Sequence, residues 1–395
     1  MSSRLSYVWL ATRRGLGAGA AVGLLRAFGS PEAVFAADRT SLTTVRDCPL
    51  RKVQVDALCD KNTDQAERIL AQCAGDGIQI ITLGDSAYPD RLRAIENPPV
   101  VLYVRGKWPD FDVMPGIAVV GTREATPYGL QTAEHIGSAL GRAGFITVSG
   151  MALGNDGAAH RGALRAGGLT VAVLAGGVDV CYPPQHRGLM GDILLSGAIV
   201  SEYPPGTEPR GEHYHARNRI ISGLSVAAVI VEAPGYRSGA LITARAALDQ
   251  GRDVYAVPGA LDAPQSAACN ALIEKGEAAL LRSPEALVRT YSGLLPARSG
   301  EHRAPHFVKT PKKPQAARQT PRKREKPVPS SGALPNGLSG DERRIAELVQ
   351  QGVGTPEDLI ERCGLPAPRV MSLITMLEMD GILRREKGRL VIGCQ

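Results

Sequence analysis

Residues 117–150 read IAVVGTREATPYGLQTAEHIGSALGRAGFITVSG. The stretch places a short apolar strand at 117–120, a helical pattern at 128–142 and a second apolar strand at 145–149. The same alternation continues from about residue 78 to residue 291, which is typical of a parallel sheet covered by helices. It predicts an α/β fold with a doubly wound, Rossmann-like parallel sheet. The expected strands are 78–83, 100–104, 117–120, 145–149, 170–175, 198–201, 226–231, 254–257 and 278–281, and further helices are expected at 157–166 and 239–250.

Patterns on either side of this sheet divide the chain into four parts. Residues 1–75 are expected to form a helical domain, and residues 76–292 the Rossmann-like domain. Residues 293–340 are basic and rich in proline, so we expect a disordered linker there. Residues 341–395 predict three helices closed by a two-stranded wing, which together make a winged helix-turn-helix domain.

The net charge of +7 is concentrated in the basic segment. Residues 296–340 hold ten Lys or Arg and two Asp or Glu, whereas residues 1–295 hold 28 of each kind. Any nucleic-acid site in the folded part therefore has to be a local cluster of cations rather than a general positive field. The linker itself either screens phosphates or serves as an extended, charged spacer.

Composition favours a protein of the cytoplasm. No apolar run reaches the roughly 18 residues that a membrane helix needs, so no membrane insertion is expected. The first residues lack an uninterrupted apolar segment, which argues against a cleaved secretory signal. Seven cysteines without a Cys-x-x-Cys spacing argue against a disulfide framework and against a zinc site, and the expected compartment is the reducing cytosol.

The strands of the predicted sheet end in glycine-rich turns that suit an anion. In open α/β sheets, ligands bind outside the carboxyl ends of the strands. Gly121, Thr122 and Arg123 follow one strand, where a helix N-terminus would offer free N–H groups and Arg123 a bidentate fork for phosphate. Ser149 and Gly150 end the next strand and would add hydroxyl and backbone donors.

A second group of cations precedes the strand at 226–231. Arg217, Asn218 and Arg219 lie beside an apolar run, so each arginine needs an anionic partner. That partner is either a ligand phosphate or an internal carboxylate such as Glu202 or Glu232.

Two further segments complete the candidate site. Arg237, Ser238 and Gly239 lie on the loop before the helix at 239–250 and are expected to form a second phosphate cradle. Asn270 is either a helix N-cap or an amide that contacts a ligand. Asp156 is interpreted in the same two ways, as an N-cap or as part of the site.

No sequence pattern for catalysis accompanies these turns. The chain has no Gly-x-x-x-x-Gly-Lys-Ser/Thr loop, no Gly-x-Ser-x-Gly elbow and no His-Glu-x-x-His helix. His213 and His215 lack the nearby cysteines or paired carboxylates that would fix a metal. The sequence therefore predicts no catalytic residue, no metal and no cofactor, and it favours binding over catalysis.

The order and spacing of these segments resemble the DNA-processing protein A family, also called DprA or Smf. The resemblance covers residues 78–292, and the flanking modules also fit, the first as a sterile-alpha-motif-like domain. It implies a protein that binds single-stranded DNA and protects incoming DNA in natural transformation. It also implies loading of the recombinase RecA, and homodimers formed through the Rossmann-like domain. The motifs are VVGTREATPYG, VSGMALGNDGAAHRGAL, VAVLAGGVDVCYP, SEYPPGTEP, RNRIISGLS, VIVEA, SGALITARAAL and YAVPG.

The resemblance also implies roles for individual residues. It places Arg123, Arg237 and Asn270 in contact with DNA, and it gives the motif with Arg217 and Arg219 a partly structural role. The chain departs from the family's usual Gly-Ile-Asp triplet at residues 154–156, and from its usual glycines at residues 267–268. The residues expected to shape the phosphate pocket are Gly121, Ser149, Gly150, Ser238 and Gly239.

Two other functions compete with this interpretation. A nucleotide phosphoribohydrolase of the lysine-decarboxylase-like group has a related sheet and a Pro-Gly-Gly-x-Gly-Thr-x-x-Glu pattern. Here residues 234–240 read PGYRSGA, without the second glycine, and no glutamate follows. A duplex-DNA regulator would use the winged helix, but residues 341–395 hold eight basic and nine acidic residues, so a protein contact or accessory role is at least as well supported.

Overall fold

The computed structural model describes residues 1–46, 48–235, 238–296 and 340–392, the last range with gaps at 366–369, 372, 375, 378–381 and 387–388. The chain divides into two compact units, residues 1–307 and residues 308–395. Each is described by itself. The predicted linker lies almost wholly outside the described residues.

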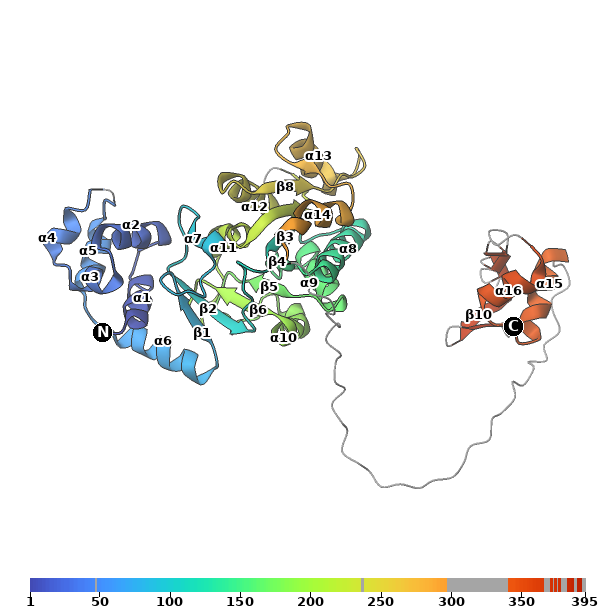
Figure 1. Ribbon diagram of the computed structural model, residues 1–395, viewed down its shortest axis with the longest axis horizontal. Coiled ribbons are helices and arrows are strands. Elements are labelled where there is room, and N and C mark those ends of the chain that lie inside the picture. Colours follow the sequence, from blue (N-terminus) through green and yellow to red (C-terminus); the bar gives the residue numbers. More distant parts are fainter. Residues whose placement is uncertain are drawn as a thin grey trace, which may run out of the picture. The chain divides into compact units, whose positions relative to one another are not determined.

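A nine-stranded sheet forms the centre of the first unit (Figure 1), in the order β1-β2-β6-β5-β4-β3-β7-β8-β9. The strand pairs from β6 to β9 are parallel, as predicted, whereas β2 is antiparallel to both of its neighbours. The short segment 107–115 after β2 contains no helix that would cross back over the sheet, so the chain reverses direction there. The sheet is therefore mixed and mainly parallel. The strands are β1 Gln79–Thr82, β2 Val101–Gly106, β3 Gly116–Val120, β4 Ile146–Ser149, β5 Thr170–Val173, β6 Ala198–Ser201, β7 Ser225–Ile230, β8 Asp253–Ala256 and β9 Ala279–Leu280.

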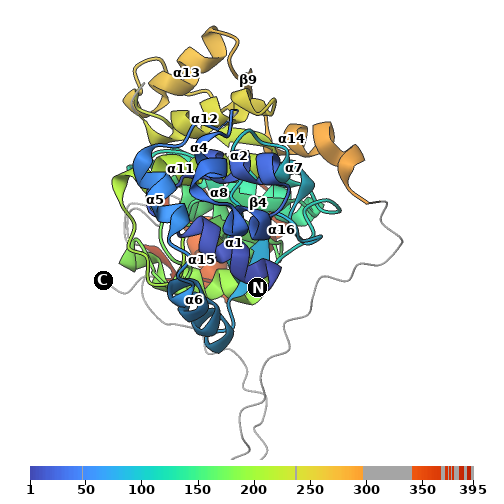
Figure 2. The ribbon, with the colours of Figure 1, turned by 90° about the vertical axis from the view of Figure 1, so that its left-hand side faces the viewer.

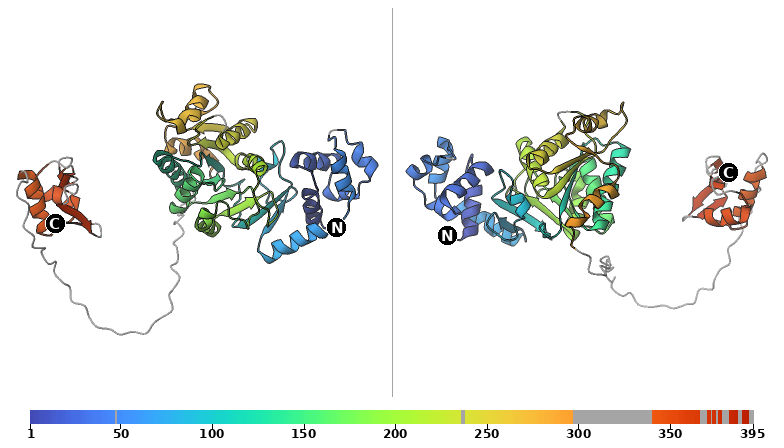
Figure 3. Two further views of the ribbon diagram at one scale, coloured as in Figure 1. Left: turned by 180° about the vertical axis from the view of Figure 1, so that it is seen from behind. Right: turned by 45° about the horizontal axis from the view of Figure 1, so that its top comes forward.

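Helices cover both faces of this sheet (Figure 3), which is the doubly wound arrangement predicted from the alternating pattern. Alternate side chains of each strand point to opposite faces, so Ala118 and Val120 pack on one helical layer and Ile117 and Val119 on the other. The first layer contains α7 Asp90–Arg93, α11 Gly211–Gly223, α12 Gly239–Asp249 and α13 Ala267–Glu274. The second contains α8 Pro127–Ala143, α9 Asn155–Arg165, α10 Arg187–Ser196 and α14 Pro284–Tyr291. Three short 3₁₀ helices lie at η1 Pro184–His186, η2 Pro264–Ser266 and η3 Ser292–Leu294.

Six helices precede the sheet and pack around the fully buried Trp9 (Figure 2, in blue). Ser30 caps the third of them by accepting a hydrogen bond from the Ala33 N–H, and Pro31 occupies its first position. Their apolar side chains join one core with Tyr103 and Ile199 of the sheet. They are α1 Ser3–Ala11, α2 Ala18–Phe28, α3 Pro31–Ala36, α4 Arg39–Thr43, α5 Lys52–Cys59 and α6 Asp64–Gly75.

The second unit has its own apolar core. Helices α15 Gly340–Gln350 and α16 Pro356–Cys363 are followed by described helical residues between 370 and 377, and by an antiparallel hairpin of β10 Leu383–Glu386 and β11 Arg389–Ile392. Four apolar side chains of this segment are buried in one core with α15, α16 and the hairpin: Val370, Leu373, Ile374 and Leu377. Met371 and Met376 are exposed. In the described parts of both units, no helix is both long and apolar enough to cross a membrane.

Candidate functional site

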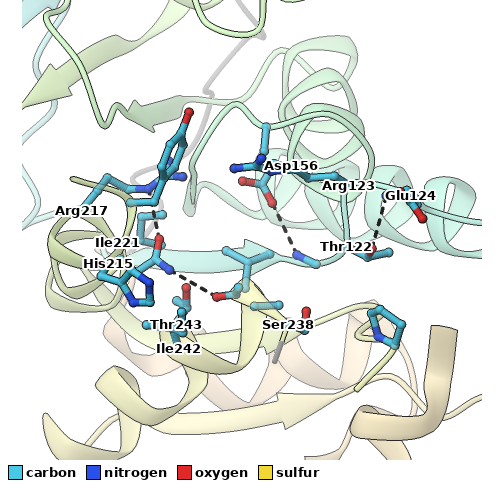
Figure 4. A pocket seen from close by; sticks show the side chains of 18 of the residues that line it. Thr122, Arg123, Glu124, Asp156, His215, Arg217, Ile221, Ser238, Ile242 and Thr243 are labelled. Atoms are coloured by element: carbon cyan, nitrogen blue, oxygen red, sulfur yellow. Dashed lines mark hydrogen bonds between the residues drawn. The ribbon is translucent and has the colours of Figure 1, made fainter. Parts of the chain in front are cut away.

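The strand order reverses between β3 and β7, which are hydrogen-bonded neighbours. The chain leaves β3 for α8 on one face of the sheet and leaves β7 for α12 on the other. Such a switch point opens a crevice between the two outgoing loops, where open α/β sheets bind ligands. A cavity of about 640 Å³ lies there (Figure 4). The predicted residues that line it are Gly121, Thr122, Arg123, Arg217, Asn218, Ser238 and Gly239.

The turn after β3 is tightly packed and requires its glycine. A Cβ on Gly121 would lie 2.2 Å from the side-chain nitrogen of Asn155, so no larger residue fits without displacing α9. The Gly121 N–H points toward the Asp156 carboxylate, at 3.4 Å. Thr122 then closes the turn, because its hydroxyl accepts the Glu124 N–H at 3.2 Å. The backbone of the cavity floor is therefore held by contacts between β3 and α9.

The N-terminus of α8 is already occupied by protein groups. The buried Glu232 carboxylate accepts the N–H and the hydroxyl proton of Thr126, and the Thr126 hydroxyl in turn accepts the Gly129 N–H. Pro127 has no N–H to offer. The expectation that this helix offers free N–H groups to an anion is therefore wrong for Thr126 and Gly129.

The N-terminus of α12 has a different environment. Ser238 is its N-cap residue but makes no capping hydrogen bond, and Ser238, Gly239 and Ala240 all line the cavity. The positive end of an 11-residue helix therefore faces the cavity without a side-chain cap. Arg237, predicted to share this loop, lies outside the described residues.

Among the described residues of the cavity, Arg123 is the exposed arginine. Its guanidinium carbon lies 5.0 Å from the ring centroid of Tyr214 on α11, which is within the range of a cation–π contact. The side chain is thus oriented by an aromatic ring while its charge stays accessible to solvent. This arrangement suits recognition of an anionic group by a planar fork of donors.

Arg217 lies beneath the cavity and is bound by the protein itself. It is only 5% exposed and donates to the carbonyl oxygens of Gly150, at 2.8 Å, and Val173, and to the side-chain oxygen of Asn218. Burial lowers the pKa of Arg217, and the nearby Asp156 carboxylate opposes that shift. Burial likewise raises the pKa of Asp156, which the charge of Arg217 opposes. The two charges compensate each other in a site from which water is largely excluded.

Arg219 points away from this cavity. One terminal nitrogen of its guanidinium lies 2.7 and 2.6 Å from the two carboxylate oxygens of Glu202. The pair lines a second cavity, of about 460 Å³, beside α2. The sequence left two kinds of partner open for Arg219, a ligand phosphate and an internal carboxylate, and the structure shows the carboxylate of Glu202. Glu232, the other carboxylate considered, binds the start of α8 and not an arginine.

Two other predicted residues have structural contacts. The fully buried Ser149 donates its hydroxyl proton to the Val119 carbonyl at 2.6 Å, so it joins β4 to β3. The Asn270 amide both donates to and accepts from the backbone of Gly259, at 3.1 Å each, and α13 begins at Ala267, so Asn270 is not its N-cap. Neither Ser149 nor Asn270 lines the main cavity.

Three further residues make contacts between the loops and helices around the cavity. Asn218 donates from its amide to the Gly239 carbonyl at 3.2 Å, which ties α11 to the start of α12. Gly150 packs so closely on Arg217 that a Cβ would lie 1.9 Å from the guanidinium. Asp156 is not the N-cap of α9, because that position is held by Gly154; its carboxylate accepts the Gly150 N–H at 3.0 Å instead.

Sequence reasoning missed several residues on α11. Tyr214, His215 and Ile221 line the cavity together with Arg217 and Asn218. Their spacing of three, four and seven residues is that of one helix face, and this was the signal available in the sequence. In the described part of the chain, no group of three His, Cys, Asp or Glu side chains is placed to hold a metal ion.

The cavity can therefore hold an anionic ligand. In the part of the site that the structure describes, the positive groups are Arg123, the N-terminus of α12 and the buried Arg217, and Arg217 compensates the buried Asp156. Glu124 and His215 lie at its exposed rim. The hydroxyls of Thr122, Ser238 and Thr243 add hydrogen-bonding groups around the same space, as expected for recognition of phosphate oxygens.

Comparison with known proteins agrees with the motifs. A model of the family described as DNA recombination-mediator protein A matches residues 79–292, and a model described as DprA winged helix domain matches residues 329–389. Protein Smf of Synechocystis sp. is 42% identical over 212 residues, which make up 53% of this chain and 53% of that protein. The match thus spans about half the length of this relative. DNA processing protein DprA of Bacillus subtilis is 39% identical over 213 residues, 54% of this chain and 71% of the relative.

A solved structure supports the fold as well. The X-ray structure of DNA processing protein A from Streptococcus pneumoniae aligns with a TM-score of 0.63 and 31% sequence identity. The alignment covers 73% of this chain and 98% of the pneumococcal chain.

Proposed function

Because the chain belongs to the DNA recombination-mediator protein A family, we propose that it binds single-stranded DNA in the cavity between β3 and β7. The observation that carries this proposal is the convergence of Arg123 and the uncapped N-terminus of α12 on one concave site. Both are groups that bind phosphate oxygens without reading sequence. We therefore expect affinity to depend on the sugar–phosphate backbone and not on base sequence.

Single strands fit this site better than duplexes for a geometric reason. Duplex DNA is read by an element that projects into a groove, whereas a recessed cavity takes up a phosphate whose neighbouring base is free to leave the stack. The charge of the winged helix domain does not favour duplex binding either, because residues 341–395 hold nine acidic and eight basic residues. We assign that domain an accessory role.

The biological setting follows from the family and from the resemblance of the motifs. We propose that the protein protects incoming DNA during natural transformation and helps load the recombinase RecA onto it. We propose that it does so in the cytoplasm, as a homodimer and without catalysing a reaction on its ligand. Arg237, Ser238, Gly239, Gly121 and Arg123 are the proposed phosphate contacts.

A titration with labelled oligonucleotides tests the proposal. Fluorescence anisotropy of the full chain with single- and double-stranded oligonucleotides of one sequence, at several salt concentrations, should give tighter binding of the single strand. Affinity should decrease with salt, because bound cations on the protein release counterions from the DNA. Equal affinity for both forms at every salt concentration would contradict the proposed single-strand preference.

The partner role has a separate test. RecA filament formation on DNA coated with single-stranded-DNA-binding protein should become faster when the full chain is added. An unchanged rate would remove RecA loading from the proposal while leaving DNA binding in place.

A further inference from the structure

A small recess adjoins the cavity and differs from it in chemistry. It has a volume of about 60 Å³ and shares Arg123, Ala152 and Tyr214 with the larger cavity. Its other walls are mainly apolar or aromatic, since they include Leu153, Tyr182 and Pro183. A charged cavity and an apolar recess thus meet at Arg123 and Tyr214.

Two tyrosines from distant parts of the chain form the wall of this recess. The ring centroids of Tyr182 and Tyr214 lie 6.4 Å apart, with an angle of 61° between the ring planes. Tyr214 is half-buried and lies under the guanidinium of Arg123. Tyr182 is 49% exposed and Leu153 is 38% exposed, so both side chains are accessible to a ligand.

The chemistry of the two sites matches the two halves of a nucleotide. A phosphate requires charge and N–H donors, which the cavity supplies through Arg123 and α12. A nucleobase requires a flat apolar surface, and stacking on an aromatic ring stabilises it without hydrogen bonds to its edges. Because Arg123 borders both spaces, a nucleotide whose phosphate binds Arg123 has the recess with Tyr182 next to it.

We propose that Tyr182, supported by Tyr214 and Leu153, forms a nucleobase-stacking subsite. The proposal rests on the proposed function, because it concerns the same bound strand, but it adds a recognition element for the base. Stacking accepts every base, since each has a π face, so this subsite binds DNA without sequence preference. It also adds selectivity for single strands, because a paired base cannot stack on a protein ring.

An abasic scan of a bound oligonucleotide tests this subsite. Binding of the full chain to a short oligothymidylate is compared with binding to otherwise identical strands in which one base at a time is replaced by an abasic residue. The wild-type chain should lose about 5- to 150-fold in affinity at one or more positions, equivalent to about 1–3 kcal/mol. Tyr182→Leu should bind the intact strand more weakly and should no longer respond to the abasic substitution at that position.

Two further variants separate stacking from general effects. Tyr182→Phe keeps the aromatic ring and should still lose affinity when the base is removed. If the hydroxyl of Tyr182 were the binding group, Tyr182→Phe would behave like Tyr182→Leu. Tyr128→Leu is the matched control, because Tyr128 is 50% exposed and lines neither the recess nor the cavity. It should bind and respond like the wild type. Thermal unfolding of each variant shows that the fold is retained.

The outcomes distinguish this proposal from the proposed function. If the wild type binds DNA but is insensitive to abasic residues at all positions, the stacking subsite is wrong and DNA binding stands. If Tyr182→Leu keeps the full response, the base stacks elsewhere and the assignment to Tyr182 is wrong. If no strand binds at all, the proposed function fails together with the subsite.

Discussion

Replacement of Arg123 by alanine gives the most direct test of the binding site. The side chain is exposed, and its described contact is with the ring of Tyr214, so the fold should lose no more than about 0.5–1 kcal/mol. A charge-assisted hydrogen bond to a phosphate contributes about 1.5–3 kcal/mol. Arg123→Ala should therefore weaken single-strand binding about 10- to 150-fold with little change in thermal stability. Arg123→Lys should weaken it less, because the charge remains and only the bidentate fork is lost.

The assay is the same anisotropy titration at constant salt, accompanied by a salt series. Arg26→Ala is the matched control: Arg26 is exposed on α2 and does not line the cavity, yet its removal changes the net charge by the same amount. The Arg26 variant should bind within about twofold of the wild type, since one remote exposed charge is largely screened. If Arg123→Ala binds with wild-type affinity and salt dependence, phosphate recognition does not occur in the cavity between β3 and β7.

The other predictions concern two buried residues and one half-buried residue. Arg217→Met should lower the free energy of unfolding by about 3–5 kcal/mol, because the substitution leaves the Asp156 carboxylate buried without a compensating charge. Urea unfolding measures this loss, and a loss below about 1 kcal/mol would contradict the coupling between the two charges. Burial lowers the pKa of His160 to about 3 from its usual 6.5, so the unfolded chain binds the proton more readily and stability decreases as the pH falls from 6.5 toward 3. His160→Gln should reduce the pH dependence of the free energy of unfolding by about 1.4 kcal/mol per pH unit. Urea unfolding at pH 6.5 and 4.5 measures this dependence, and an unchanged value would show that His160 is not the group responsible. Asn270→Ala should lower stability by about 1–3 kcal/mol through the loss of its two bonds to Gly259, and unchanged unfolding would count against that clamp.

The sheet was predictable because local patterns determine it. Each of the nine strands is a short apolar run bounded by turn residues, and all nine lie where the alternation of strands and helices placed them. The two antiparallel pairings of β2 were not predicted, because the direction of a strand depends on the connection between strands rather than on the strand itself. The position of the cavity followed from the same pattern, since it lies at the carboxyl ends of β3 and β7.

The roles of the arginines could not be predicted, because they depend on partners far away in the sequence. Arg217 and Arg219 are two residues apart on one helix, yet one contacts the backbone of Gly150 and the other the carboxylate of Glu202. The sequence indicated only that each needed an anionic partner, whereas Arg217 donates to backbone carbonyl oxygens. Which of them faces the cavity depends on the rotation of α11, and that rotation is determined by the packing of Ile220 and Ile221 on the sheet.

The buried carboxylates explain how a binding site for anions tolerates acidic residues in its walls. Asp156 accepts N–H groups from the turns after β3 and β4, and Glu232 accepts the N–H and the hydroxyl proton of Thr126 at the start of α8, so both carboxylates hold loops in place. Their negative charge would repel a phosphate if it were uncompensated, and the low dielectric of the interior would strengthen that repulsion. Arg217 offsets Asp156, which among the residues that the structure describes leaves Arg123 and the N-terminus of α12 as the groups whose positive charge acts on a ligand. Loss of Arg217 should therefore weaken binding even where the fold survives, because the cavity would gain the uncompensated charge of Asp156.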